Sequence, residues 1–449
     1  MKNPKGHLAD RISPLGDIVD CVRRAWPEGI GRAGIAESLG ISWQIADKHI
    51  NKLVAEGILK QDNKSYFIDK DIASFLGIAI GRRNVKVVIV NFAFKPFSKE
   101  KLTKFHLEGL LEGEVTNAES ATKEYIICYD TPTTIEEMSD LLNRIMGIVL
   151  ESHEKYDLNL GGIGIAFTGA VESDKSIVTA CHTISYLAGR SIDDLISGIY
   201  LDKLKQEDIP LVVDHNAKAC LIHQREALYH AADPSHKVLA GKPNIAVVYM
   251  GTGISAGFSF NGKMYRGCKG YSGEIGHIPS PRFHVEDDDY ALAQADLDRY
   301  LDCTCGRKGC FEDVLKKSVF FYNEKGIKAG KSNDDILSDE RLKNLYEEDR
   351  PRYECLKKYI GFLIGVLLNT LSPDVLIFAG RLFNLTQNLK NELKVCAGLN
   401  TLPYIGKSCA VIAGNTSPGT VAIGVAIEAC FAACRQGDEE EIIWYPVIK

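Results

Sequence analysis

The fold class is decided by two stretches, VVYMGTGISAGFSFNGKMYRG at residues 247–267 and GYSGEIGHI at residues 270–278. The first continues a strand-like apolar run that begins at residue 245 and ends in a Gly-Thr-Gly turn. Further strand-like runs alternate with helical patterns. The strand-like runs lie at residues 77–81, 85–90, 162–167, 211–213 and 375–378, and the helical patterns at residues 134–152, 217–232 and 359–371. This alternation predicts an α/β body, in which the first two runs form a β-hairpin.

The first 70 residues follow a different pattern, with three short helices and two short apolar runs. The helices are predicted at residues 14–26, at residues 32–39 before Gly40, and from a Ser42 cap to Gly57. The apolar runs, residues 58–60 and 66–68, predict a two-stranded wing. The apolar positions of the helices are Leu15, Ile18, Val19, Val22 and Trp26 in the first and Ile45, Ile50, Leu53 and Val54 in the third. Together these elements predict a winged helix-turn-helix that binds double-stranded DNA. A protein–protein module is the alternative.

The third helix would present its polar side chains to DNA. Gln44 and Asn51 can bind adenine through two hydrogen bonds, and Lys48 or Lys52 can contact phosphate or guanine. Trp43 either faces solvent with them or covers the core. The predicted DNA-binding residues, including candidates for backbone contacts, are Arg32, Ser42, Trp43, Gln44, Lys48, Asn51, Lys52, Lys60 and Lys64.

Three cysteines follow His277 in the sequence CTCGRKGCFEDVL at residues 303–315. Thiolates at Cys303, Cys305 and Cys310 can surround one tetrahedral Zn²⁺ together with an imidazole, because Gly306 and Gly309 permit tight turns between them. No open coordination position is implied, so the predicted zinc is structural. Three free cysteines on a loop are the alternative.

Composition and charge restrict the class of protein. The chain has 449 residues, 45% hydrophobic and 25% charged, which predicts several globular domains. The net charge is −6, while residues 1–70 carry 11 Lys and Arg against 9 Asp and Glu. The odd number of cysteines, 13, favours reduced thiols over a disulfide framework. No signal peptide or membrane-spanning segment is predicted, so we expect a cytoplasmic protein.

These motifs together resemble those of the ROK family of repressors, open reading frames and sugar kinases. The resemblance includes GIGIAFTGAV at residues 162–171 and SPDVLIFAGRL at residues 372–382. The stretch AESLGISWQIADKHINKLVAEGIL at residues 36–59 is similar to the winged-helix heads of bacterial repressors. The family implies a body with an actin-like ATPase fold, which has two lobes and a ligand cleft between them. The expected parts are a head at 1–70, a first lobe at 71–200 to which a helix at 425–436 returns, a second lobe with the zinc site at 201–436, and a tail at 437–449 that packs on the body.

The resemblance also implies a sugar site and a zinc site. The sugar would be held by Asp214, Glu274, His277 and Glu312, whose oxygens and nitrogens suit hydroxyl groups. Asp214 stands where the family's kinases keep their general base, although it could instead cap the helix that follows. Val213 replaces the family's usual Asn, and the acidic segment 281–302 is longer than the usual connection between the His and the cysteines.

The nucleotide side departs further from the kinases of this family. They open with Asp-x-Gly-Gly-Thr, whereas this chain has Ala79-Ile80-Gly81-Arg82-Arg83. Ala79 cannot bind a metal ion, and Arg82 is bulky where phosphate must approach the backbone. We therefore predict a DNA-binding repressor of carbohydrate metabolism rather than an enzyme. It would sense a sugar or sugar derivative and bind a near-palindromic operator as a homodimer or homotetramer. The alternatives are an active sugar kinase and a regulator whose body binds a protein.

Overall fold

The structure is a computed structural model, and the residues that it describes are 16–112, 114–117, 125–231, 233–251, 253–281, 303–313, 350–380, 387–415 and 417–434. Four predicted features therefore lie wholly or partly outside the described residues: the start of the first helix, the acidic segment beyond residue 281, the end of the helix at 425–436, and the tail at 437–449. Contacts divide the chain into two units, Met1–Gly241 with Ser417–Lys449 and Lys242–Thr416. None of the described helices is long and apolar enough to cross a membrane.

Residues 16–68 contain three helices and a small antiparallel sheet. The helices are α2 (Gly16–Arg24), α3 (Arg32–Leu39) and α4 (Trp43–Ala55). The strands β1 (Ile30–Gly31), β2 (Leu59–Asp62) and β3 (Ser65–Ile68) pair in the order β1-β3-β2. Gly40 ends α3 in the left-handed conformation at φ 63°, and the Ser42 side chain caps α4 by accepting from the Ile45 amide at 3.3 Å.

The apolar positions predicted for this region are mostly, but not all, in its core. Val22 of α2 and Ile50 and Leu53 of α4 are fully buried. Ile45, predicted as an apolar position of the third helix, is 48% exposed, and Ala46 takes the buried position beside it. Strand β1 was not predicted, because two residues are too few to produce a recognisable pattern.

The first unit is built on a six-stranded mixed sheet. Its order is β12-β8-β4-β5-β7-β6, with β8 and β12 parallel to β4 and the other neighbours antiparallel. The strands are β4 (Ser74–Ile80), β5 (Asn84–Asn91), β6 (Glu114–Asn117), β7 (Tyr125–Asp130), β8 (Leu160–Phe167) and β12 (Leu211–His215). The helices of this unit's body are α5 (Lys99–Lys104), α6 (Ile135–Lys155), α7 (Gly198–Gln206), α8 (Asn216–Tyr229), α9 (Pro234–Ala240) and α16 (Thr420–Ala433). A small sheet of β9 (Ala170–Glu172), β10 (Ile177–Ala180) and β11 (Arg190–Ser191) follows β8.

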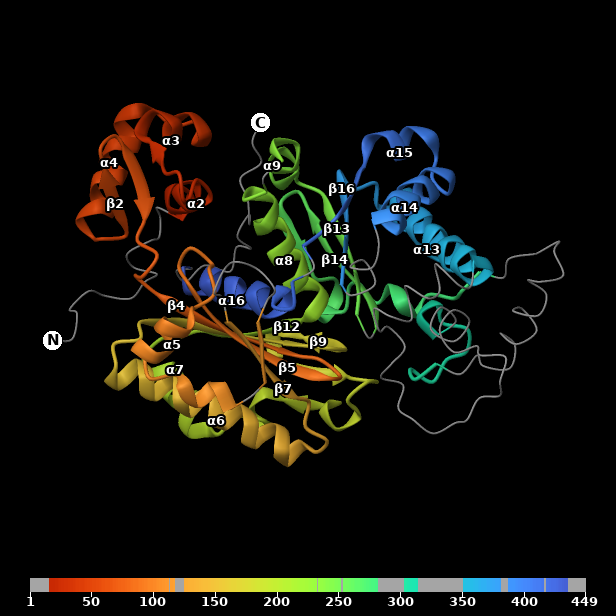
Figure 1. Ribbon diagram of the computed structural model, residues 1–449, viewed down its shortest axis with the longest axis horizontal. Coiled ribbons are helices and arrows are strands. Elements are labelled where there is room, and N and C mark those ends of the chain that lie inside the picture. The colour runs from red at the N-terminus through yellow and green to blue at the C-terminus, as the bar shows by residue number, and fades with distance from the viewer. Residues whose placement is uncertain are drawn as a thin grey trace. The chain divides into compact units, whose positions relative to one another are not determined.

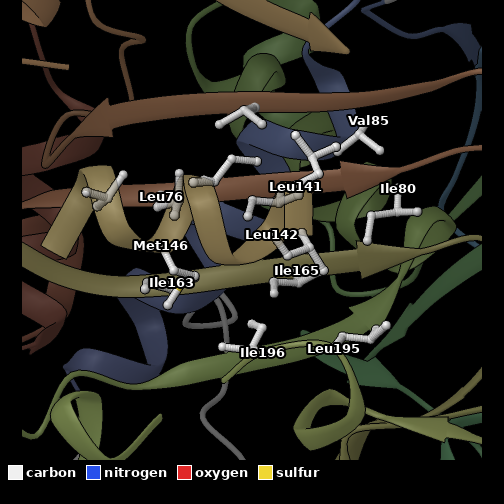
Figure 2. Close-up of a cluster of buried hydrophobic side chains, with 14 of the residues drawn as sticks. Leu76, Ile80, Val85, Leu141, Leu142, Met146, Ile163, Ile165, Leu195 and Ile196 are labelled. Atoms are coloured by element: carbon white, nitrogen blue, oxygen red, sulfur yellow. The ribbon is translucent and has the colours of Figure 1, made fainter. Parts of the chain in front are cut away.

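Helices cover both faces of this sheet. Figure 2 shows Leu142 and Met146 of α6 among Leu76, Ile163 and Ile165 of the strands, in one large buried cluster. Helix α16 packs on β4, β8 and α8 and runs along the other face, as Figure 1 shows. Gly164 makes this approach possible, because a Cβ there would lie 2.1 Å from the backbone oxygen of Val425.

The second unit repeats the topology of the first. Its sheet has the order β15-β14-β13-β16-β17, with β13, β16 and β17 parallel. The elements are β13 (Ile245–Met250), β14 (Ile254–Phe260), β15 (Lys263–Tyr265), β16 (Val375–Ala379), β17 (Ala410–Ala413), α13 (Arg350–Leu371), α14 (Gln387–Leu399) and α15 (Pro403–Ser408). Each sheet contains three adjacent antiparallel strands, β4-β5-β7 and β13-β14-β15, extended beside the first of them by two parallel strands. The first sheet has β6 as a further antiparallel strand at its edge. The α/β class is thus confirmed, and the repetition agrees with two related lobes.

The border between the units differs from the expected one. The sequence prediction ends the first lobe at residue 200, but β12 and α8 lie beyond it and belong to the first unit. The reason is the pairing of β12 with β8, in which Leu211 aligns with Ile163 and His215 with Phe167. The helix expected at 425–436 begins earlier, at Thr420, and packs on the first unit.

Candidate functional site

The first candidate site is the His–Cys cluster of the second unit. His277, Cys303, Cys305 and Cys310 each offer one ligand atom, and these atoms all lie within 4.8 Å of one another. The Cys303 Sγ is 3.6 Å from His277 Nδ1, and the Sγ atoms of Cys305 and Cys310 are also 3.6 Å apart. One imidazole and three thiols in this arrangement could hold a metal ion, and the residue types suit zinc.

The backbone around the cluster brings residues 277 and 303–310 together. Gly306 and Gly309 both have positive φ, 82° and 70°, as the tight turns between the cysteines require. The Ser280 amide donates to Gly309 O at 2.8 Å, and the Phe311 amide donates to Ile278 O at 2.9 Å. Burial raises the pKa of the Cys310 thiol to about 12, and the neighbouring thiols add to this shift. A bound cation would offset the mutual repulsion of the thiolates.

Two glutamates expected to bind sugar lie next to this cluster. Glu274 Oε2 is 3.9 Å from His277 Nε2, so the carboxylate can orient the imidazole whose Nδ1 faces the cysteines. Glu312 is 8% exposed, and its Oε2 accepts from the Ile254 amide at 2.7 Å. A Cβ on Gly276 would lie 2.9 Å from this Glu312 oxygen. The cluster, Glu274 and Glu312 therefore form one connected set in the second unit.

Asp214 lies in the first unit, at the end of β12, and is fully buried. Its Oδ1 accepts from the His215 amide at 2.7 Å and from Ser173 Oγ at 3.1 Å, and it lies 3.4 Å from Lys218 Nζ. Asp214 does not cap helix α8. The cap is His215, whose Nδ1 accepts from the Ala217 amide at 3.1 Å. Burial, reinforced by the nearby Lys218 charge, lowers the pKa of His215 to about 3, so its imidazole is neutral.

The structure adds two residues to this site that the sequence analysis missed. Lys218 is fully buried one turn after Asp214 and forms its ion pair. Asn216 is 9% exposed and donates through Nδ2 to Ile80 O at 3.3 Å, while its Oδ1 has no hydrogen-bond partner among the described residues. The i,i+4 spacing of Asp214 and Lys218 could have revealed the pair. Val213, by contrast, is buried in the apolar cluster of the first unit.

The segment that would bind phosphate in a kinase forms a short turn between β4 and β5. Ala79 lies within β4 and is 6% exposed, so this position carries a methyl group where the family's kinases have a carboxylate. The Gly81 amide donates to Asn84 O at 3.0 Å, and Gly81 O accepts from Thr131 Oγ1 at 2.6 Å. The Gly81 N–H is thus used within the turn.

The last candidate site is the exposed face of α4. The predicted DNA-binding residues Trp43, Gln44, Lys48, Asn51 and Lys52 are all exposed. Ser42 is also exposed, although its hydroxyl is used as the helix cap. Lys60 lies on β2 and Lys64 in the turn between β2 and β3, and both side chains are exposed. Lys60 Nζ is 3.0 Å from Asp69 Oδ1.

Arg32, expected to contact DNA phosphate, is held within the head. Its Nη1 is 2.5 Å from Asp47 Oδ1, and its Nη2 donates to the Tyr66 hydroxyl and to Asn51 Oδ1. The guanidinium carbon also lies 5.4 Å from the centre of the Trp43 ring. Arg32 thereby connects α3 to α4 and β3, and it pairs with the acidic side chain of α4.

Comparisons with known proteins identify the family of the chain. The sequence model of the ROK family matches residues 75–427. A glucokinase of Halalkalibacterium halodurans is 23% identical over 313 residues, which cover 65% of this chain and 83% of that protein. A xylose repressor of Bacillus spizizenii is 20% identical over 410 residues, which cover 88% of this chain and 90% of that protein.

A solved structure has a similar fold over nearly the whole chain. It is a ROK family transcriptional regulator described as a homolog of the E. coli MLC protein. The TM-score is 0.61 at 16% sequence identity, over 95% of this chain and 97% of that one. At this identity the likeness concerns the fold alone. Because the family match covers most of the chain, from β4 through α16, the protein belongs to the ROK family.

Proposed function

We propose that the chain is a DNA-binding transcriptional repressor of carbohydrate metabolism whose body binds a sugar or sugar derivative and transfers no phosphoryl group. The observation that carries this proposal is the arrangement of residues 16–68. Helices α2, α3 and α4 are followed by the hairpin β2–β3, and α4 presents Gln44, Lys48 and Asn51 to solvent. This arrangement is typical of a winged helix-turn-helix, in which α4 would be the recognition helix. The similarity to a xylose repressor over 410 residues supports it.

Three observations on the described residues support a body that transfers no phosphoryl group. Ala79 supplies no carboxylate for a metal ion, and the Gly81 N–H is bonded to Asn84 O rather than open to phosphate. Asp214, in the position of the general base, is paired with the buried Lys218. A carboxylate that is already paired with an ammonium is a weak acceptor for a hydroxyl proton. The sugar would therefore bind as an effector and leave unchanged.

The sites of the regulator are assigned as follows. Asp214, Glu274, His277 and Glu312 would hold the effector. His277 would also join Cys303, Cys305 and Cys310 in holding a structural Zn²⁺. Zinc would connect the loop of Glu274 to the segment of Glu312, so it would organise part of the effector site. The head at residues 1–70 would bind paired half-sites of a near-palindromic operator, in a homodimer or homotetramer. The tail at residues 437–449 would pack on the body.

A thermal-shift screen tests the body, and duplex selection from a random pool tests the head. The zinc-loaded protein would be screened against neutral sugars, amino sugars, sugar phosphates, and ATP with Mg²⁺. A sugar that stabilises the protein and changes its affinity for a selected duplex supports the repressor. Stabilisation by ATP with Mg²⁺, followed by sugar phosphorylation, would show a kinase instead. If no compound of the panel changes the unfolding temperature and the protein still binds the selected duplex tightly, a protein effector is favoured.

A further inference from the structure

Two large apolar side chains are exposed at the start of α4. Trp43 is 53% exposed and Ile45 is 48% exposed, while the face of this helix that packs on the core consists of Ala46, Ile50 and Leu53. A single exposed apolar side chain is ordinary on a protein surface, so exposure alone decides nothing. The neighbours of Ile45 decide which kind of partner this surface suits.

The surface around Ile45 is cationic. Lys48 and Lys52 follow it at i+3 and i+7 and are exposed on the same face of α4. Lys52 Nζ lies 3.8 Å from Glu56 Oε1 in a solvent-exposed pair, which is weak enough to exchange for a phosphate. The one acidic residue of α4, Asp47, is paired with Arg32 at 2.5 Å. Ile45 is therefore an apolar group one turn from the Lys48 ammonium and two turns from Lys52, and the nearby Asp47 carboxylate is neutralised by Arg32. A complementary partner must be anionic and must also present an apolar group.

Duplex DNA meets both requirements in its major groove. Phosphates border the groove, and the C5-methyl group of thymine is the apolar group that projects into it. Ile45 also lies in the first turn of α4, where its amide is bonded to the Ser42 cap. Recognition helices contact base edges through such N-terminal residues. Trp43 is less free to do so, because its ring lies against the Arg32 guanidinium.

We propose that Ile45 recognises thymine, by packing its side chain against the C5-methyl group of one or two thymines in each half-site. This inference rests on the proposed DNA-binding function and names the base that one residue reads. Lys48 and Lys52 would contact the flanking phosphates, and Arg32 would act as a positioning residue that removes the charge of Asp47 from the groove.

The test replaces thymine by deoxyuridine, which lacks only the methyl group. The full-length zinc-loaded protein first enriches a duplex from a random pool, and each thymine of that duplex is then replaced in turn. For the wild-type protein we expect about fourfold weaker binding at one or two positions per half-site, the value of one buried methyl group. Ile45→Ser should bind the thymine and deoxyuridine duplexes equally, whereas Ile45→Val should keep part of the discrimination.

A matched control separates this contact from a general loss of apolar surface. Ile199, on α7, is 78% exposed, and Ile199→Ser should discriminate thymine from deoxyuridine as the wild type does. The proposal is overturned if no thymine position is sensitive, or if Ile45→Ser keeps the full wild-type discrimination. If the protein still binds the selected duplex tightly, either of these results leaves the proposed DNA-binding function intact. Enrichment of no duplex would overturn both, because Ile45 would then have no base to read.

Discussion

Replacing Lys218 by Met should destabilise the first unit strongly, since it leaves the carboxylate of Asp214 buried without its ion-pair partner. Both side chains are fully buried, and the Nζ and Oδ1 atoms lie 3.4 Å apart. Removing one partner of a buried pair costs about 3–5 kcal/mol. Asp214 would keep the hydrogen bonds from Ser173 and the His215 amide, so we expect the lower end of that range. This corresponds to a fall of roughly 6–12 °C in unfolding temperature.

The assay is thermal unfolding of the full-length protein, followed by circular dichroism, for Lys218→Met, Asp214→Asn and the double variant. The double variant should recover much of the loss, because it leaves no uncompensated charge. Lys155→Met is a matched control. Lys155 is also four residues after its partner, Glu151, at 2.8 Å, but both side chains are exposed, so its unfolding temperature should not change measurably. The reasoning is refuted if Lys218→Met changes stability as little as this control, or if the losses of the two single variants simply add.

Four further outcomes are expected. Chelation or Cys305→Ser should release one zinc per chain and lower the unfolding temperature, whereas substitution of the exposed Cys268 should do neither. Arg23→Met breaks a buried pair between α2 and α8, in which Nη1 lies 2.5 Å from Glu226, so the amides of α2 should exchange roughly a hundredfold faster. Burial lowers the pKa of His223 from 6.5 to about 4. The stability that depends on its neutral imidazole, up to about 3 kcal/mol, is therefore complete above pH 6.5 and is lost as the pH falls towards 4. His223→Leu should make the loss of unfolding free energy with falling pH less steep, although the His215 contribution remains. Gly164→Val should destabilise by more than about 3 kcal/mol, because its Cβ would meet Val425 O, while Gly198→Ala, with nothing near its Cβ, should not.

Local patterns predicted the parts of the structure that depend on local physics. The Ser42 cap, the left-handed Gly40 and the turns at Gly306 and Gly309 follow from residue chemistry within a few positions, and each lies where it was expected. The cysteine spacing likewise predicted a cluster that His277 completes from another segment.

Features that depend on distant contacts were missed. The first lobe extends beyond residue 200 because β12 pairs with β8, and no periodicity within residues 201–241 reveals that pairing. Ile45 was assigned to the core because apolar spacing cannot tell it from Ala46, its buried neighbour. The position of Arg32 depends on Asp47 and Tyr66, which lie 15 and 34 residues away in sequence. From the sequence alone, a basic residue at the start of a helix is as consistent with a contact to DNA phosphate as with these contacts inside the head.

A regulator of the proposed kind needs a physical connection between its effector site and its DNA-binding head. Helix α8 could provide that connection, because it begins beside Asp214 and ends in contact with α2. Its first turn follows Asp214 and includes Asn216, whose side chain reaches Ile80 O at the end of β4. Its last turn carries Glu226 and Tyr229, which hold Arg23 and Arg24 of α2. The helix has 14 residues and is buried along almost its whole length, so it spans about 20 Å as a stiff element. Because α8 is stiff, a shift of its first turn that accompanies binding near Asp214 would move the whole helix, including the residues that hold Arg23. If the effector binds one position of α8 more tightly than another, effector binding and the position of α2 are coupled in both directions.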